Sequence, residues 1–166
     1  ENGIRLKSGE QLEADIIVTA TGLDLRVLGD VDITVDGQPI DVSKTFSYKS
    51  MMFSDVPNLV STFGYINASW TLKADLTAEY ACRLLNHLSA TGMRQCTPRL
   101  QAHEQEMAGA DWIDGFSSGY IQRKMHLLPK QGTESPWLNT QNYTLDRKVI
   151  GEGPIEDGWM QFSSPG

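Results

Sequence analysis

The sequence predicts an α/β fold, and three observations support this prediction. Residues 16–18 form a continuous apolar run, which is typical of a strand covered on both faces, as in parallel sheets. Residues 57–63 form a second strand-like run, bounded by Pro57 and Gly64. Between residues 69 and 88 apolar side chains recur every four positions, which is typical of an amphipathic helix that packs on a core.

The length and composition describe an ordinary globular chain. Its 166 residues are 40% apolar and 21% charged, and a compact domain of this length buries roughly 70% of its unfolded surface. The formal net charge of −7 argues against nucleic acid or an anionic membrane as the main partner. No apolar run approaches the ~20 residues that span a bilayer, no secretory leader opens the chain, and the two cysteines lack metal-site spacing. We therefore expect a cytoplasmic protein with reduced thiols and no metal.

A first strand pair is predicted at residues 3–18, with a turn at Ser8 and Gly9. The chain begins inside this pattern, so we expect the strands to belong to a larger sheet. The second strand ends in four small residues at 19–22, and small side chains at the carboxyl end of a central strand let a ligand or another backbone come close. A plain chain turn explains the same residues, and both interpretations stay open.

A hairpin and two further strands are predicted next. Asp36 and Gly37 suit a type I′ turn, which predicts a hairpin over residues 31–42. Residues 45–53 and 57–63 follow as the two strands. The second strand therefore leads directly into the segment that opens the helix.

The helix at residues 69–88 is the longest predicted element. Its apolar stripe consists of Leu72, Leu76, Tyr80, Leu84 and Leu88. Glu79 and Arg83 on the opposite face have the spacing of an ion pair, and Gly92 is suited to end the helix. Cys82 widens the apolar stripe, so we predict that it is a buried and inert thiol.

Beyond Gly92 the patterns are weaker. Residues 98–116 predict a short helix and a loop, and residues 118–132 predict a short helix that ends near a proline. Residues 143–150 predict one strand. These elements form a second segment of the chain, distinct in pattern from the strands and the long helix before them.

The joint between Gly64 and the long helix carries no carboxylate. It offers Asn67, Ser69, Trp70 and Thr71 instead, although helix amino termini usually attract acids because their N–H groups are unpaired and the macrodipole is positive. An electron-rich ligand group, such as the pyrimidine carbonyl of a flavin, suits such a helix end. Side-chain capping by Asn67 or Ser69 accounts for the same residues, and this alternative stays open.

The side chains alone predict no redox or hydrolytic site. The three histidines, His87, His103 and His126, lack ligand partners at metal-site spacing. No nucleophile elbow or zinc-hydrolase motif is present, and GEGPIEDG opens no helix, so it is not a dinucleotide fingerprint. Demanding chemistry therefore requires a cofactor.

Three stretches of the sequence resemble one family. ADIIVTATGLDL resembles the stretch of flavin-dependent monooxygenases in which the chain passes from the NADPH domain back into the FAD domain. GYINASWTLKADLTAEYACRLLNHL is similar to the FAD-domain helix of Baeyer–Villiger monooxygenases, in particular the subgroup of the mycobacterial ethionamide-activating enzyme. SGYIQRKMHLLPKQG, followed by SPW and NY, resembles the carboxyl-terminal region of that subgroup. The similarity runs in order from Gly3 to Phe162.

The resemblance implies a class B flavoprotein monooxygenase. In such an enzyme NADPH reduces FAD, and a flavin peroxide oxygenates a ketone or a sulfur compound, here a thioether or thioamide. The resemblance places Thr21 and Gly22 near the domain crossover. It places four further positions beside FAD: Asn67, Ala68, Ser69 and Trp70. Trp70 serves equally well as a core anchor.

The chain departs from the family because it lacks both glycine-rich fingerprints, for FAD and for NADPH, and the arginine that stabilises the flavin peroxide. The resemblance therefore implies a carboxyl-terminal fragment of a flavoprotein with two dinucleotide-binding domains. Residues 1–91 correspond to the carboxyl-terminal portion of the FAD-binding domain, and residues 92–166 to a carboxyl-terminal extension.

Three interpretations of such a fragment stay open. The chain is inactive alone and works with a chain that supplies the missing amino-terminal portion, or it is a truncated remnant without activity, or it belongs to a heteroatom-oxidising flavin monooxygenase. In each case the strands at 16–18 and 59–63 lack neighbours, so we expect exposed apolar faces and poor solubility of the isolated chain.

Overall fold

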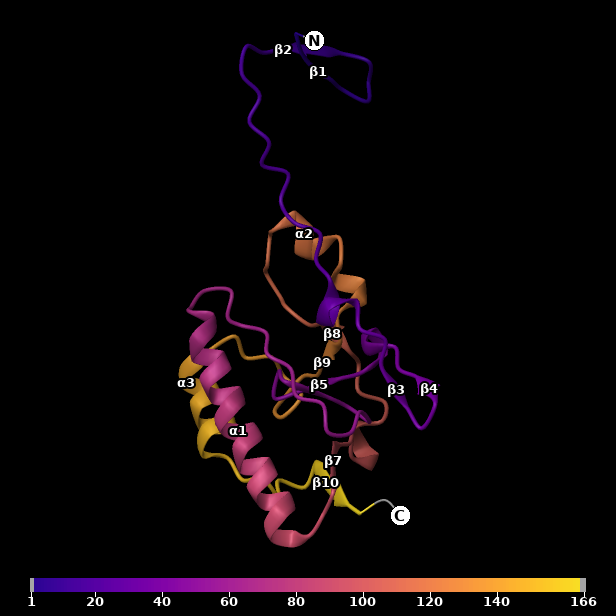
Figure 1. Cartoon of the computed structure of the whole chain (residues 1–166), viewed down its shortest axis with the longest axis vertical. Coiled ribbons are helices and arrows are strands. Elements are labelled where there is room, and N and C mark those ends of the chain that lie inside the picture. The colour runs from indigo at the N-terminus through magenta and orange to yellow at the C-terminus, as the bar shows by residue number, and fades with distance from the viewer. Residues whose placement is uncertain (1, 165–166) are drawn as a thin grey trace.

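The computed structural model describes residues 2–164 and shows a mixed α/β fold in which one long helix lies beside short hairpins and irregular segments (Figure 1). The helices and strands are β1 (Gly3–Arg5), β2 (Gln11–Glu13), β3 (Thr34–Val35), β4 (Gln38–Pro39), β5 (Ser47–Tyr48), β6 (Met52–Phe53), α1 (Trp70–Thr91), β7 (Gln95–Pro98), β8 (Ala110–Asp111), α2 (Gly119–Gln122), β9 (Lys130–Gln131), α3 (Tyr143–Asp146) and β10 (Met160–Ser163). Within this part of the chain every sheet is a pair of antiparallel strands. The predicted parallel sheet is therefore not formed by these residues.

Two predicted hairpins are confirmed. β1 pairs with β2 in the register Gly3↔Glu13. β3 pairs with β4, and the residues between them, Asp36 and Gly37, have positive φ angles of 50° and 76°. Two successive positive φ angles are what a type I′ turn requires, and this turn matches the twist of the flanking strands.

The predicted strand at residues 16–18 is wrong for this chain. The three side chains are 82%, 49% and 84% exposed, and the backbone forms no ladder. They belong to an extended link that joins the β1–β2 hairpin to the rest of the molecule (Figure 1). A central strand needs neighbours on both edges, and the described residues provide none beside this link.

The two strands predicted before the helix also differ from the structure. Residues 45–53 form a hairpin, β5–β6, because Lys49 and Ser50 adopt positive φ angles of 50° and 57° and reverse the chain. Residues 59–63 form no strand, although the Ser61 N–H donates to the Met51 carbonyl at 2.7 Å. The buried hairpin thus takes the central place that the sequence assigned to the longer strands.

The long helix is confirmed with nearly the predicted bounds. α1 covers Trp70–Thr91 and ends at Gly92, whose φ of 71° is the left-handed conformation that glycine adopts without strain. Cys82, however, is exposed, so its predicted burial is wrong. It follows Tyr80 by two residues, which is about 200° around the helix, and therefore lies away from the buried face.

The predicted strand at residues 143–150 is also wrong, because this segment is helical. Asn142 caps α3 by accepting a hydrogen bond from the Leu145 N–H at 3.2 Å, and a π-helical turn, Arg147–Glu152, continues from it. Asparagine is a preferred cap because its side-chain oxygen satisfies an otherwise unpaired N–H. The cap thus favours a helical start over an extended strand at this point in the chain.

Arg83 lies against the end of this helical segment. Its guanidinium donates to the carbonyls of Ile150 at 2.8 Å and of Gly151 at 2.6 Å, and to that of Gly153. Arg83 thus binds helix-end carbonyls in place of the predicted ion pair with Glu79. The arrangement is favourable because a cation near a helix carboxyl terminus meets unpaired carbonyls.

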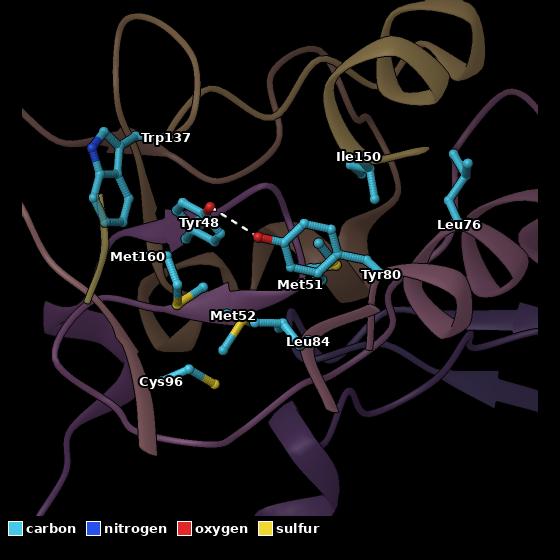
Figure 2. Packing of buried hydrophobic residues seen from close by; sticks show 10 residues of the cluster. All are labelled: Tyr48, Met51, Met52, Leu76, Tyr80, Leu84, Cys96, Trp137, Ile150 and Met160. Carbon is cyan, nitrogen blue, oxygen red and sulfur yellow. Dashed lines mark hydrogen bonds between the residues drawn. The ribbon is translucent and has the colours of Figure 1, made fainter. Parts of the chain in front are cut away.

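One hydrophobic cluster joins the two halves of the chain (Figure 2). Its buried members are Tyr48, Met51, Met52, Leu76, Tyr80, Leu84, Cys96, Trp137, Ile150 and Met160. Tyr48 and Tyr80 share a hydrogen bond of 3.1 Å between their hydroxyl groups. The cluster contains residues from both sides of position 91. The division of the chain into residues 1–91 and residues 92–166 stays a prediction.

Candidate functional site

The amino end of α1 is open to a ligand. Ser69 is its cap residue, with φ of −62° and ψ of 135°, but its side chain makes no capping hydrogen bond and instead contacts the Thr71 hydroxyl at 2.7 Å. The first turn contains no acidic residue. The backbone N–H groups at the positive end of a 22-residue helix are therefore not satisfied by a side-chain cap, and they suit an electron-rich partner.

A buried ion pair fixes this end of the helix. Lys73 is 2% exposed and donates from Nζ to Asp146 Oδ2 at 2.8 Å. Asp146 also accepts hydrogen bonds from the Tyr65 hydroxyl at 2.8 Å and from the Thr140 hydroxyl at 2.6 Å. Burial lowers the pKa of Lys73 from its ordinary value, and the carboxylate of Asp146 opposes this effect. The pair holds α1 against α3 just behind the open turn.

A cavity of about 280 Å³ lies beside the first residue of α1. Phe63 stands between two indoles, with ring centroids 4.9 Å from Trp70 and 4.6 Å from Trp112. Gly64 permits this arrangement, because a side-chain carbon there would lie 2.1 Å from the Trp70 ring. Residues 25–29 and the β5–β6 hairpin complete the wall. The site thus combines an aromatic, mainly apolar cavity with an open helix end.

The six predicted positions fall into two groups. Thr21 and Gly22 lie exposed in the extended link, whose next residues reach the segment that follows α2: Asp24 pairs with Lys124 at 3.0 Å. The remaining four positions, 67–70, are exposed at the start of α1, and Trp70 lines the cavity. The structure brings Trp70 together with residues 25–29, which follow the first group along the chain. Contact of all six with FAD stays a prediction.

Several residues of the site were missed in the sequence. Phe63, Trp112, Ser47 and Ser50 line the cavity, but they come from three separate segments and share no motif. Lys73 did carry a signal, because it precedes Leu76 by three residues and therefore lies on the apolar stripe of the helix. A lysine in that position must find a buried partner, although the sequence alone does not indicate Asp146.

The described residues offer no other obvious cofactor site. From residue 2 to residue 164, no three histidine, cysteine or acidic side chains lie together in a way that could hold a metal ion. Over the same residues no helix combines the length and the apolar character needed to cross a membrane. The donors at the start of α1 fit the ring end of a flavin, whereas the chain has no glycine-rich loop for the phosphates of a dinucleotide.

Comparison with known proteins identifies relatives along the whole chain. It is 46% identical over 162 residues to the probable FAD-binding monooxygenase AlmA of Acinetobacter baylyi, covering 98% of this chain and 32% of that protein. It is 45% identical over 161 residues to the FAD-containing monooxygenase EthA of Mycobacterium tuberculosis, covering 97% of this chain and 32% of the relative. For the putative FAD-containing monooxygenase MymA of the same species the identity is 41% over 165 residues, with 99% and 33% covered.

These relatives are about three times longer than this chain, which spans about a third of their length. The matched part is their carboxyl-terminal third. No family model matches the sequence, and no solved structure matches it.

Proposed function

The chain is homologous to the carboxyl-terminal third of FAD-containing monooxygenases, and we propose that it acts as the carboxyl-terminal part of an FAD- and NADPH-dependent monooxygenase. The substrates are ketones or sulfur compounds. The observation that carries the proposal is 41–46% identity across 97–99% of the chain. The proposal includes a portion that supplies the two glycine-rich fingerprints, either in the same polypeptide or as a separate chain.

In this proposal the open end of α1 faces the flavin ring. FAD supplies the redox chemistry when it is bound. Residues 67–69 and the first-turn N–H groups bind the ring carbonyl on which negative charge develops, and a helix amino terminus stabilises such charge. Trp70, 54% exposed beside the cavity, packs against the ring and shields it from water. The ion pair of Lys73 keeps the helix end in position.

The extended link is suited to bind a further portion of the protein. Its apolar residues 16–18 are exposed, and its backbone has no strand partner among the described residues. Unpaired strand edges with apolar side chains readily pair with another strand. We propose that residues 14–22 add as a strand to the sheet of the amino-terminal portion, which brings Thr21 and Gly22 to the crossover between its domains.

The direct test joins this chain to the amino-terminal two thirds of the Acinetobacter baylyi relative. We expect the joined protein to retain FAD absorbance after free cofactor is removed. We also expect it to consume NADPH and to form an ester from a ketone or a sulfoxide from a thioether. If the joined protein retains FAD but forms no oxygenated product from either substrate, the proposed activity is wrong.

A charge placed at the helix end tests the site itself. Ser69→Asp introduces a carboxylate at the start of α1, whereas Asn86→Asp introduces the same charge on an exposed position near the other end. Charges at a helix terminus contribute about 0.3–2 kcal/mol, so we expect Ser69→Asp to slow NADPH-dependent oxygenation about two- to thirtyfold. Asn86→Asp serves as the control and should match the parent. Equal rates in both variants would show that this helix end does not face the flavin.

A further inference from the structure

Two side-chain amides connect the turn before α1 to the wall of the cavity. The Ile66 N–H donates to Gln141 Oε1 at 2.9 Å, and Gln141 Nε2 donates to Asn139 Oδ1 at 3.1 Å. Asn139 Nδ2 then donates to the carbonyl of Trp112, which lines the cavity, at 2.8 Å. A series of three hydrogen bonds thus leads from the residue before Asn67 to the cavity wall.

The direction of this series is fixed at both ends. The backbone N–H of Ile66 can only donate and the carbonyl of Trp112 can only accept, so each of the two amides has one orientation that satisfies its partners. Hydrogen bonds in such a series polarise one another, which strengthens each of them. Loss of one amide therefore affects the whole connection and not a single bond.

Asn139 is the buried centre of the connection. It is 8% exposed, its backbone N–H donates to Gln131 Oε1 at 3.0 Å, and its Oδ1 also accepts from the Ser50 hydroxyl at 3.0 Å. Ser50 and Trp112 line the cavity from separate segments, whereas the two amide residues do not belong to the cavity lining formed by the described residues. Asn139 thus joins two walls of the cavity without lining it.

The residue between the two amides contacts the buried ion pair. The Thr140 hydroxyl donates to Asp146 Oδ1 at 2.6 Å, and Asp146 pairs with Lys73 of α1. Residues 139–141 therefore contact the cavity wall, the ion pair and the turn before α1. Residues 66–69 of that turn are exposed and form neither helix nor strand. Because such segments open at low cost, the bond from Gln141 matters for where the turn lies.

We propose that Gln141, together with Asn139, is a positioning residue of the flavin-facing site, and that it fixes residues 66–69 relative to the aromatic cavity wall. The inference rests on the proposed function, which places residues 67–69 beside the ring of FAD. Misplacing a binding group by about 1 Å can slow a reaction about a hundredfold. A residue that does not touch the cofactor can therefore control the rate.

Amide hydrogen exchange of the chain tests the first step without a cofactor. Gln141→Met removes the acceptor of the Ile66 N–H and keeps the length of the side chain. We expect the Ile66 amide to exchange about two- to twelvefold faster, the equivalent of one hydrogen bond. Gln105→Met is the matched control, because it removes a bond of 3.1 Å to the Leu100 carbonyl away from the described cavity lining. Its Ile66 exchange should match the parent.

A second variant tests the series itself. Asn139→Leu leaves Gln141 in place but removes its acceptor, so the Ile66 amide should exchange faster although Asn139 does not contact it. The double variant with Gln141→Met should show no further increase, because both substitutions break one connection. Amides in the middle of α1 report global opening and serve as the reference. Parent-like exchange of Ile66 in Gln141→Met would overturn the proposal.

The joined protein tests the role at the flavin. There Gln141→Met should lower kcat about ten- to hundredfold and change KM less, because it misplaces the turn and leaves the cavity lining intact. It should also make the midpoint potential of the flavin more negative, since the charge on the reduced ring loses contacts at the helix end. Gln105→Met should match the parent in both. A merely structural role of Gln141 would leave the potential unchanged, and this result would overturn the proposal.

Failure of this inference and failure of the proposed function are distinguishable. If the joined parent is active and Gln141→Met matches it in kcat and potential, the proposed function stands and the positioning role is wrong. If the joined parent consumes no NADPH, the proposed function fails and the role at the flavin fails with it. The exchange of Ile66 then still decides whether Gln141 holds the turn.

Discussion

The buried pair of Lys73 and Asp146 allows a sharp prediction about stability. Asp146→Asn keeps the size of the side chain and an oxygen that can accept from Tyr65, but it removes the charge opposite Lys73. Lys73 is 2% exposed, so its ammonium group cannot turn to water without opening the start of α1. The substitution therefore leaves a buried charge without its partner.

The magnitude follows from the geometry. At the observed 2.8 Å between Nζ and Oδ2, two unit charges attract by about 6 kcal/mol for an effective dielectric constant of about 20. The desolvation of both charges offsets part of this attraction, and removing one partner of a buried pair typically costs about 3–5 kcal/mol. A protein of this size unfolds with roughly 5–15 kcal/mol. The substitution thus removes a large share of the total stability.

Urea unfolding of the parent and the variant, followed by far-UV circular dichroism, measures this loss. We expect the midpoint to fall without a change in slope, because the surface exposed on unfolding stays the same. The double variant Lys73→Met with Asp146→Asn is the matched control. It removes both charges, and it should recover most of the loss because neutral replacements of buried pairs are often tolerated.

The stability that this pair provides also depends on pH. Burial lowers the pKa of Lys73 below its ordinary value of 10.5, so the unfolded chain binds more protons and stability rises with pH up to that value. Asp146 opposes this lowering, so its loss lowers the pKa of Lys73 further and makes the stability of Asp146→Asn rise more with pH than that of the parent. The deficit of the variant should therefore shrink as the pH approaches 10.5. A loss below about 1 kcal/mol at neutral pH, or a double variant less stable than the single one, would refute the reasoning.

Three further predictions concern the core and the cavity. Burial raises the pKa values of Tyr48 and Tyr80, so the stability that their protonated forms provide is fully present below about pH 10. Above pH 10 the free energy of unfolding should fall by about 1.4 kcal/mol per pH unit for each of the two tyrosines. Urea midpoints measured across this range check the slope, and a flat profile contradicts it. Glu104→Ala leaves two indole N–H groups unpaired and should cost about 3 kcal/mol in urea unfolding, whereas an unchanged midpoint means that these bonds contribute nothing. Gly64→Ala forces the Trp70 ring aside and should cost about 1–3 kcal/mol with a change in tryptophan fluorescence; parent-like stability and emission would show that the contact is loose.

The exposed link of residues 14–24 explains why one kind of sequence inference failed. The apolar run at 16–18 is a sound strand signal, but a strand exists only where neighbours complete its hydrogen bonds. In this chain no described segment pairs with it, and its side chains are exposed. Residues 59–63 also form no strand, although Val60 packs against the main cluster and Phe63 contacts Trp70 at the start of α1.

The sequence by itself determined the local features whose information lies in neighbouring residues. The period of apolar side chains fixed α1, Gly92 fixed its end, and Asp36 with Gly37 fixed a hairpin turn. The absence of acidic residues at the start of α1 also follows from the sequence, because it concerns a few consecutive residues. Only the tertiary structure decided the cavity and the buried pair, since Trp112 meets Phe63, and Lys73 meets Asp146, across 49 and 73 positions of the chain. Such contacts depend on how separate elements pack, and no local pattern encodes them.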